Sequence, residues 1–316
     1  MKLSVLVPAY NLEKYISDCL VSLLTQNLAH EFEVIVCDDA STDNTANVIR
    51  NLESEYNNLR AVYKTLNHGL AKNMQTLVHL ARGEYVAYVD GDDLALPGKL
   101  TALVNYLDRN RDCHMVYHES EMFESDTGKA VRLFSQTYYN WAYIPRRSAL
   151  THLIQYGTYM QASSVMFRNH PKLKETTSSD YRLILDYPFY LMNAGYLQAN
   201  IDFIPSVLGR YRIHSDSFAA RTRRDNVRRI QSADDMIAAV KACKKFGISR
   251  KVIDKGIVQH EFAAALFFLF KEEDSLFQMY IEKSSVNRKF FNDKHELSWT
   301  LRRNPNKLRN MLQRKL

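Results

Sequence analysis

Tyr85-Val-Ala-Tyr-Val-Asp90-Gly91-Asp92-Asp93 is the stretch of this chain that decides the fold. Its first five residues are apolar, aromatic or β-branched, which indicates a buried strand. Three carboxylates then surround Gly91, which permits a sharp turn where Asp90 and Asp92 can converge on one point. Converging carboxylates repel each other unless a cation lies between them, and hard oxygen ligands suit Mg²⁺ or Mn²⁺. The alternative is an acidic turn that caps a helix beginning near Leu96-Pro97, with proline in its first turn.

The composition is that of a soluble globular protein. The chain has 316 residues, of which 46% are hydrophobic and 24% charged, enough for one large domain or two modest ones. No stretch offers the roughly 18 uncharged apolar residues of a membrane span, and the N-terminus lacks the pattern of a signal peptide. The four cysteines, Cys19, Cys37, Cys113 and Cys243, are scattered without a C-x-x-C pair. This argues against a zinc site or a disulfide framework, so we expect a cytoplasmic protein.

The net charge of +7 is unevenly distributed. Basic residues gather around residues 221–229, at 241–245 and in the tail from Arg302 to Lys315. Solvated helix faces are the favoured interpretation of the middle clusters. The tail, residues 297–316, mixes apolar and basic residues at roughly helical spacing. That pattern suits peripheral docking on an anionic membrane, here the inner face of the plasma membrane, although a helix that docks on a partner protein would look the same.

Strands alternate with helical stretches over the first hundred residues. The expected strands are Leu3 to Pro8, Phe32 to Cys37, Arg60 to Tyr63 and the run that ends at Asp90. This order predicts βαβ units, and therefore an α/β fold with a mostly parallel sheet flanked by helices. After Leu100 the periodicity blurs, and from about residue 223 the pattern is helical. We predict a domain over 1–220, with a nucleotide-binding half (1–110) and an acceptor half (111–220), followed by a helical, basic region over 221–316.

Ligands of such sheets bind at the carboxyl ends of the strands. The residues just after the strands are Pro8 to Asn11, Asp38-Asp39, Asn67 and Gly69, and Asp90 to Asp93. Most of them are acidic or carry an amide, which is unusual for a phosphate-binding site without a metal and natural for one with a metal. No G-x-G-x-x-G, P-loop or G-x-S-x-G motif is present, which disfavours a dehydrogenase, a P-loop NTPase and a hydrolase of that type.

Four segments resemble the GT-A-fold glycosyltransferases, specifically the large bacterial family-2 group. They are Ser4-Val-Leu-Val-Pro8-Ala9-Tyr10-Asn11, the run from Glu33 to Thr45, Asn67-His-Gly69-Leu-Ala-Lys72-Asn73, and the run from Gly83 to Asp93. Beyond residue 100 the likeness is thinner, although Tyr211-Arg212-Ile-His214-Ser-Asp-Ser217 looks like the family's Y-R-x-H-x-x-S segment. The resemblance implies a Rossmann-like GT-A domain with a C-terminal helical extension.

The resemblance also implies roles for individual residues. Asp92 and Asp90 would hold Mn²⁺ or Mg²⁺, with His214 as a further ligand and Arg212 reaching the diphosphate. Asp39 would bind the nucleobase between walls formed by Pro8, Tyr10 and Asn11. The remaining residues of the expected nucleotide-sugar site are Asn67, Gly69, Lys72 and Gly91.

The expected reaction needs a base that deprotonates the acceptor hydroxyl as it attacks the anomeric carbon from the opposite face. The candidate is Asp186, which opens a predicted helix, although Leu185 stands where the family usually has glutamate. Asp180 is a competing candidate. Gln161-Ala-Ser163-Ser164 is expected to line the acceptor site, with a plain strand-edge turn as the alternative.

The sequence thus predicts a metal-dependent inverting glycosyltransferase. It would move a sugar, with UDP-sugar as the favoured donor, onto a growing glycan of a cell-surface polysaccharide or a lipid-linked oligosaccharide. One alternative is a nucleotidyltransferase that makes sugar nucleotides, which would need a glycine-rich, basic loop where Pro8-Ala9-Tyr10-Asn11 stands. Another is a non-enzymatic basic protein that binds nucleic acid, and the acidic strand ends argue against it.

Overall fold

One large mixed sheet organises the protein. The computed structural model describes residues 1–138, 144–178 and 180–313. Within these residues the sheet has the strand order β3-β2-β1-β4-β9-β6-β10-β5, with β7 paired to β6 and β8 to β10. Its first half is parallel and comprises β1 (Leu3–Ala9), β2 (Phe32–Asp38), β3 (Leu59–Tyr63) and β4 (Tyr85–Tyr88). The predicted α/β fold with a mostly parallel N-terminal sheet is confirmed.

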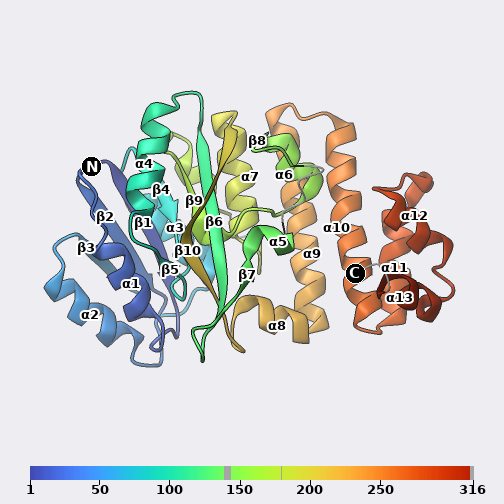
Figure 1. The fold of residues 1–316 in the computed structure, drawn as a ribbon, viewed down its shortest axis with the longest axis horizontal. Helices are drawn as coiled ribbons and strands as arrows, with labels where there is room; N and C mark the ends of the chain where they lie inside the picture. Colours follow the sequence, from blue (N-terminus) through green and yellow to red (C-terminus); the bar gives the residue numbers. More distant parts are fainter. Residues whose placement is uncertain (139–143, 179, 314–316) are drawn as a thin grey trace.

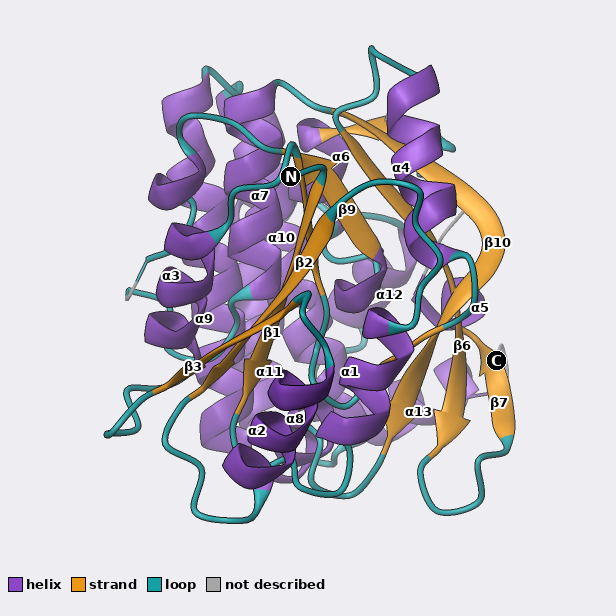
Figure 2. Ribbon diagram, turned by 90° about the vertical axis from the view of Figure 1, so that its left-hand side faces the viewer, coloured by secondary structure: helices purple, strands orange, loops and turns teal. Residues whose placement is uncertain are grey.

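Helices cover both faces of the parallel half because its strands are apolar on both sides. The helices are α1 (Ile16–Leu24), α2 (Thr45–Glu55), α3 (Leu70–Leu80) and α4 (Lys99–Arg109). All seven residues of β1 are buried: Val5 and Val7 pack in one core cluster with α1, α2 and α4, whereas Leu6 packs in the other with α3. Figure 2 shows this layering, with α1 and α3 on opposite sides of β1.

The acidic turn after β4 does not cap a helix. It leads into the two-residue strand β5 (Leu94–Ala95), which pairs with β10, and α4 begins only at Lys99. A helix does start close to Leu96-Pro97, at Lys99, but the acidic turn does not cap it and Pro97 precedes its first turn.

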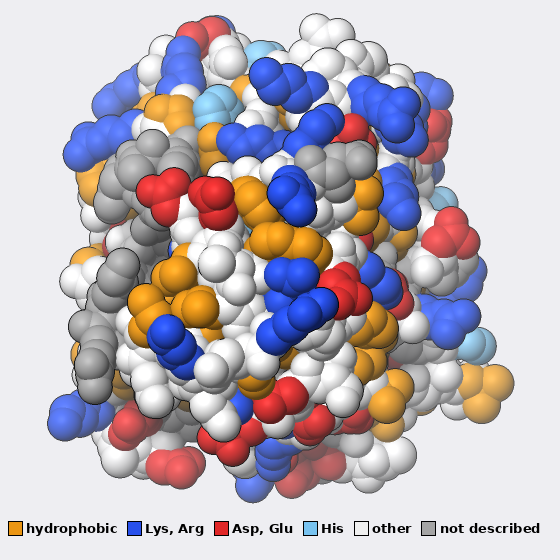
Figure 3. Space-filling model, turned by 90° about the vertical axis from the view of Figure 1, so that its right-hand side faces the viewer, with side chains coloured by type: hydrophobic (Ala, Val, Ile, Leu, Met, Phe, Trp, Pro, Cys, Tyr) orange, Lys and Arg blue, Asp and Glu red, His pale blue; other side chains and the backbone are white. Residues whose placement is uncertain are grey.

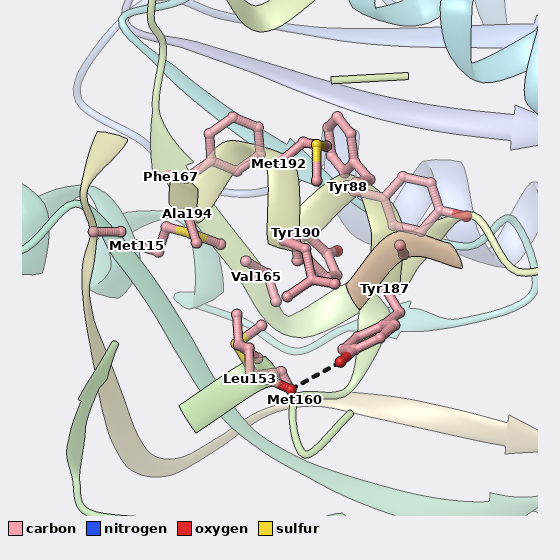
Figure 4. Close-up of a cluster of buried hydrophobic side chains, with 14 of the residues drawn as sticks. Tyr88, Met115, Leu153, Met160, Val165, Phe167, Tyr187, Tyr190, Met192 and Ala194 are labelled. Atoms are coloured by element: carbon pink, nitrogen blue, oxygen red, sulfur yellow. Dashed lines mark hydrogen bonds between the residues drawn. The ribbon is translucent and has the colours of Figure 1, made fainter. Parts of the chain in front are cut away.

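The second half of the sheet is mixed. It contains β6 (Met115–Glu124), β7 (Ala130–Leu133), β8 (Arg147–Ala149), β9 (Val165–Arg168) and the long β10 (Asn200–Ile213), with β6 and β10 parallel and β9 antiparallel to β4 and β6. The short helices α5 (Phe134–Tyr138) and α6 (Leu150–Tyr156), the 3₁₀ turns at Ala162–Ser164 and Leu173–Glu175, and α7 (Asp186–Leu197) fill the connections. Tyr187 and Tyr190 of α7 are buried in the core cluster drawn in Figure 4, where the Tyr187 hydroxyl donates to the Leu153 carbonyl at 2.9 Å. This packing fixes the beginning of α7.

The C-terminal region is helical, as predicted. It contains α8 (Phe218–Arg224), α9 (Asn226–Ala242), a 3₁₀ turn at Cys243–Phe246, α10 (Arg250–Phe270), α11 (Asp274–Ser284), a 3₁₀ turn at Val286–Arg288, α12 (Asp293–Thr300) and α13 (Pro305–Gln313). Val240 of α9 and Ile253 of α10 belong to the same core cluster as α6 and α7. A Cβ atom on Gly256 would lie 2.3 Å from the Ile154 carbonyl oxygen, so α10 approaches α6 at a distance that only glycine allows. Thus α9 and α10 extend the core of the sheet domain, and α11 to α13 lie beyond them (Figure 1).

The basic tail uses its apolar side chains inside the protein. Leu308 and Leu312 of α13 are buried in a third core cluster with α10 and α11, and Trp299 and Leu301 pack against it. Figure 3 shows the end of the molecule that these helices form, where Lys and Arg side chains alternate with acidic and scattered hydrophobic ones. The expected apolar docking face for a membrane is therefore largely covered, and residues 314–316 of the tail lie outside the described residues. Among the described helices, none combines the length and apolarity of a transmembrane span.

Candidate active site

The turn after β4 is held in place by its last carboxylate. Asp93 is buried and accepts hydrogen bonds from Ser163 Oγ at 2.6 Å, Gln161 Nε2 at 2.8 Å and the backbone N–H of Arg212 at 2.9 Å. Lys99, also buried, donates to the Ser163 carbonyl at 2.6 Å. Burial raises the pKa of Asp93 to about 7, with the charge of Asp92 as the next cause. Asp93 was not among the predicted site residues, and the structure gives it an anchoring role.

Gly91 is required for space. A Cβ atom there would lie 2.7 Å from Leu12 Cδ1 and 3.0 Å from the Pro8 carbonyl oxygen, whereas its φ angle is outside the left-handed region. The glycine therefore lets the acidic turn pack directly against the segment that follows β1, which brings two of the predicted strand ends together.

Asp92 meets His214, which follows it by 122 residues. Asp92 Oδ2 lies 3.0 Å from His214 Nε2, and the imidazole ring packs 4.7 Å from the ring of Tyr15. The His214 side chain is only 7% exposed, and its Nδ1 has no hydrogen-bond partner among the described residues. The two predicted metal ligands are thus neighbours in the structure.

Arg212 lies beside this pair and holds Asp92 in position. Its Nε donates to the Asp92 carbonyl at 2.7 Å, and an NH2 group lies 3.5 Å from Asp18 Oδ2. Its guanidinium also stacks 4.9 Å over the Tyr15 ring, and the residue is 6% exposed. Arg212 therefore positions Asp92, and the predicted contact with a diphosphate stays a prediction.

The donor set fits a hard divalent cation. The pKa of Asp90 is raised by burial, then by the charges of Asp93 and Asp92, so a cation at this turn would relieve a real repulsion. One Asp90 oxygen accepts the Tyr88 hydroxyl at 2.5 Å. Within the described ranges no three His, Cys, Asp or Glu side chains converge as a complete metal site. The residues present would hold Mn²⁺ or Mg²⁺ through Asp92 and His214, leaving the other positions to substrate oxygens and water.

Asp39, just after β2, binds the backbone of the loop that follows β3. Its carboxylate accepts the backbone N–H of Gly69 at 2.7 Å and of His68 at 3.3 Å, and pairs with Lys64 at 3.1 Å. Asn67 Oδ1 accepts the same Gly69 N–H at 3.0 Å. The φ angle of Gly69 is +81°, a conformation that favours glycine. Asp39, Asn67 and Gly69, predicted as parts of one site, therefore form one hydrogen-bonded unit.

The segment after β1 is held by hydrogen bonds, whereas the ring of Tyr10 is exposed. Asn11 has a φ of 53°, accepts the Thr42 N–H at 2.8 Å through Oδ1, and donates its own N–H to Ser41 Oγ at 2.9 Å. Tyr10, next to Pro8, is 44% exposed, so its ring is available for stacking. Lys72 is exposed and lines an open groove over α3 together with Lys64 and His68, both of which contact Asp39.

A cavity of about 580 Å³ adjoins the acidic turn. Asp90 and Asp186 both line it, and the charge of Asp186 contributes to the raised pKa of Asp90. Asp186 is the first residue of α7. Its pKa is raised because the effect of burial is larger than the opposite effect of hydrogen bonding to the backbone. Asp180 is exposed, bonds to Ser178 and is absent from this lining.

Only part of the expected acceptor segment reaches this cavity. Gln161 and Ala162 line it, whereas Ser163 and Ser164 bond within the turn that holds Asp93. The two serines do not line this cavity, and their bonds are those of a strand-edge turn.

The sequence interpretation missed the outer wall of the cavity. It comes from α8, α9 and α10, and its residues are Phe218, Ala219, Arg229, Ala233, Met236, Gln259, His260 and Ala263. The signal was visible in α9, where Arg229, Ala233 and Met236 are spaced as one helix face. Without a partner surface, that spacing could not be assigned to a site.

The chain resembles several known proteins in sequence. The family described as "Glycosyl transferase family 2" matches residues 4–176. An uncharacterized protein of Mycobacterium tuberculosis is 28% identical over 215 residues, 67% of this chain and 59% of that protein. TarS of Staphylococcus aureus, a poly(ribitol-phosphate) beta-N-acetylglucosaminyltransferase, is 42% identical over 94 residues, 29% of this chain and 16% of that protein.

Two solved structures have a similar fold. The structure of TarS residues 1–349 with UDP-GlcNAc has a TM-score of 0.64 at 20% identity, covering 98% of this chain and 88% of that one. A mannosyltransferase of Pyrobaculum calidifontis, in complex with GDP-Man and Mn²⁺, has a TM-score of 0.63 at 15% identity, covering 96% and 84%.

Proposed function

Because this chain belongs to glycosyl transferase family 2, we propose that it transfers a sugar from a nucleotide-diphospho-sugar to a hydroxyl of a growing glycan, with inversion. The observation that carries the proposal is the cavity in which Asp186 and Asp90 lie together, next to the Asp92–His214 pair. A base on one side and a cation-binding edge on the other are what a single displacement at an anomeric carbon requires. UDP-sugar is the proposed donor, as in the structure of TarS with UDP-GlcNAc.

The residues of this chain have the following proposed roles. Asp39 and the loop it holds bind the nucleobase, and the exposed Tyr10 ring stacks on it. Asp92 and His214 hold the divalent cation, which would neutralise the charge of the departing diphosphate. Asp186 accepts the proton of the acceptor hydroxyl at its carboxylate. The raised pKa of Asp186 makes this carboxylate a better proton acceptor than an exposed aspartate.

The proposed acceptor is a cell-surface polysaccharide or a lipid-linked oligosaccharide, made on the cytoplasmic side of the membrane. The name of TarS, which acts on a polymer, supports this class of acceptor. Because Leu308 and Leu312 are buried, any attachment to an anionic membrane surface would depend on the basic side chains of the tail.

A thermal-shift panel tests the donor site. The protein is melted with UDP, GDP, CDP or dTDP, each with Mn²⁺ or with EDTA, because a ligand that binds only the folded state raises the melting temperature. We expect UDP to raise it in Mn²⁺ and to lose this effect in EDTA. A shift that needs no metal would refute the metal-dependent donor site, and no shift with any nucleotide would count against the transferase itself.

A further inference from the structure

The outer wall of the cavity carries a cation without a counter-ion. Arg229 is the one Lys or Arg among the described residues that line the cavity. No described carboxylate pairs with it, its Nε has no hydrogen-bond partner there, and its guanidinium rests 4.8 Å from the Phe267 ring. Burial lowers its pKa, as expected for a charge that has been taken out of water without compensation.

Two uncharged groups that line the same cavity, Gln259 on α10 and Thr158 in the loop after α6, also lack partners. Gln259 Oε1 and Thr158 Oγ1 are buried and make no hydrogen bond within the described residues. An unsatisfied buried polar group costs on the order of 1–3 kcal/mol, so native proteins rarely retain several of them around one cavity. A ligand that carries both hydroxyl groups, which can donate to Gln259 Oε1, and an anionic group, which can accept from Arg229 and Thr158, would satisfy these groups together.

His260 does not contribute a positive charge to the cavity. It lies between the two polar groups and α7, and its Nε2 is 3.1 Å from the Tyr187 hydroxyl. Burial, followed by the charge of Arg229, lowers the pKa of His260 to about 3. The imidazole is therefore neutral at physiological pH, and the outer wall presents one positive charge.

The two ends of the cavity differ in charge. Asp90 and Asp186 lie at the sheet, where the reaction is proposed to occur, whereas Arg229 lies on α9. Asp92 and His214, the proposed cation site, are absent from the lining, so the donor diphosphate has a site of its own. The unpaired Arg229 therefore faces the ligand that occupies the cavity, and under the proposed function this ligand is the acceptor.

We propose that the acceptor is an anionic glycan, whose phosphate or carboxylate group binds Arg229 and the Thr158 hydroxyl, while one sugar hydroxyl donates to Gln259 Oε1 and another reaches Asp186. The inference rests on the proposed function only in taking this cavity as the acceptor site. Guanidinium binds both phosphate and carboxylate in a bidentate manner, so the two anions share one recognition chemistry. The aromatic rings of Tyr156, Tyr211 and Phe218 in the same lining offer apolar surface for sugar rings.

Methionine methyl NMR can locate binding inside this cavity. The full chain, labelled with ¹³C at methionine methyl groups, is titrated in UDP and Mg²⁺ with glucose 6-phosphate, glucuronic acid or methyl glucoside. Met236 and Met160 line the cavity, whereas Met166 is buried in the other core cluster and serves as an internal control. We expect the anionic probes to shift the Met236 and Met160 signals at concentrations at which methyl glucoside does not. A stronger response to glucose 6-phosphate identifies a phosphate acceptor, and a stronger response to glucuronic acid a carboxylate one.

Substitutions of Arg229 test the assignment directly. Arg229→Gln should raise the apparent Kd of the anionic probe about 10-fold or more, as expected for a lost charge-assisted hydrogen bond, and Arg229→Lys should retain part of the affinity. The matched control is Arg250→Gln, because Arg250 lies on α10 with its side chain 92% exposed. UDP-induced stabilisation should be unchanged in all three variants.

The outcomes separate the two proposals. If UDP binds but methyl glucoside perturbs Met236 as strongly as the anionic probes, or if Arg229→Gln and Arg229→Lys both leave the probe Kd unchanged, the anionic acceptor is refuted and the transferase stands. If no nucleotide binds the wild-type chain, the proposed function fails and this inference fails with it.

Discussion

Replacing Asp186 by asparagine should separate catalysis from stability. Asparagine keeps the size of the side chain and can still accept the two backbone hydrogen bonds at the start of α7, but it cannot take a proton. We expect kcat to fall about 10²–10⁴-fold, the usual contribution of a general base, which corresponds to about 3–5 kcal/mol of transition-state stabilisation.

The same substitution should raise the melting temperature near neutral pH. Burial raises the folded-state pKa of Asp186, so the native protein holds this proton to a higher pH than the unfolded chain does. Ionised Asp186 therefore lowers the free energy of unfolding above the raised pKa, and this penalty disappears below the ordinary value of about 4. The gain in Asp186→Asn should be full at pH 8 and absent at pH 3.5, as measured by thermal melts across pH.

Asp180→Asn is the control, because Asp180 lies in the preceding segment and is exposed. It should leave both turnover and the melting temperature near wild-type values. Release of UDP from UDP-sugar in the presence of acceptor measures kcat, and the UDP thermal shift measures donor binding, which should be intact in both variants. The reasoning fails if Asp186→Asn turns over normally, or if it melts lower than wild type at pH 8, since a helix-capping role predicts that loss.

Three further substitutions follow from the geometry. Asp92→Ala should abolish the Mn²⁺-dependent part of the UDP thermal shift, and an unchanged shift would remove Asp92 from the cation site. Gly91→Ala should lower the free energy of unfolding by about 1–3 kcal/mol in urea melts, because its Cβ would meet Leu12 and Pro8, and wild-type stability would contradict the close approach. Gly256→Ala should cost at least as much, since its Cβ would lie 2.3 Å from a backbone oxygen of α6, and it should loosen the outer wall without affecting UDP binding; a melt identical to wild type would argue that α10 is free to shift.

The fold of the first hundred residues could be predicted because its signals are local. β1 and β2 are short, mostly apolar runs with polar residues at or just after their ends, and the intervening helices carry apolar side chains at helical spacing. The mixed half could not be predicted in the same way. β5 has two residues, and β10 pairs with β6, β8 and β5 at once, so its partners depend on chain segments up to about a hundred residues away.

The residues of the candidate site also fall into two groups, those that local sequence predicts and those that depend on contacts between distant segments. The residues that end parallel strands, such as Asp39 and Asp92, were identified from their positions after those strands. His214 was named through a resemblance, and its contact with Asp92 depends on the register of β10. Arg229 shares a helix face with Ala233 and Met236, but an arginine on a helix is usually solvated, and only the packing of α9 reveals that its Nε lacks a partner among the described residues.

The end of β10 has a kinetic consequence. Successive side chains of a strand point to opposite faces, so Tyr211 lines the cavity while its neighbour Arg212 bonds to Asp92 and Asp93. Under the proposed function Tyr211 would contact the acceptor, whereas Arg212 positions Asp92 of the proposed cation site, so a bound donor would fix the backbone from which Tyr211 projects. We expect an ordered sequence in which nucleotide-sugar enters before acceptor and the nucleotide departs last, a pattern that product-inhibition experiments with UDP can read.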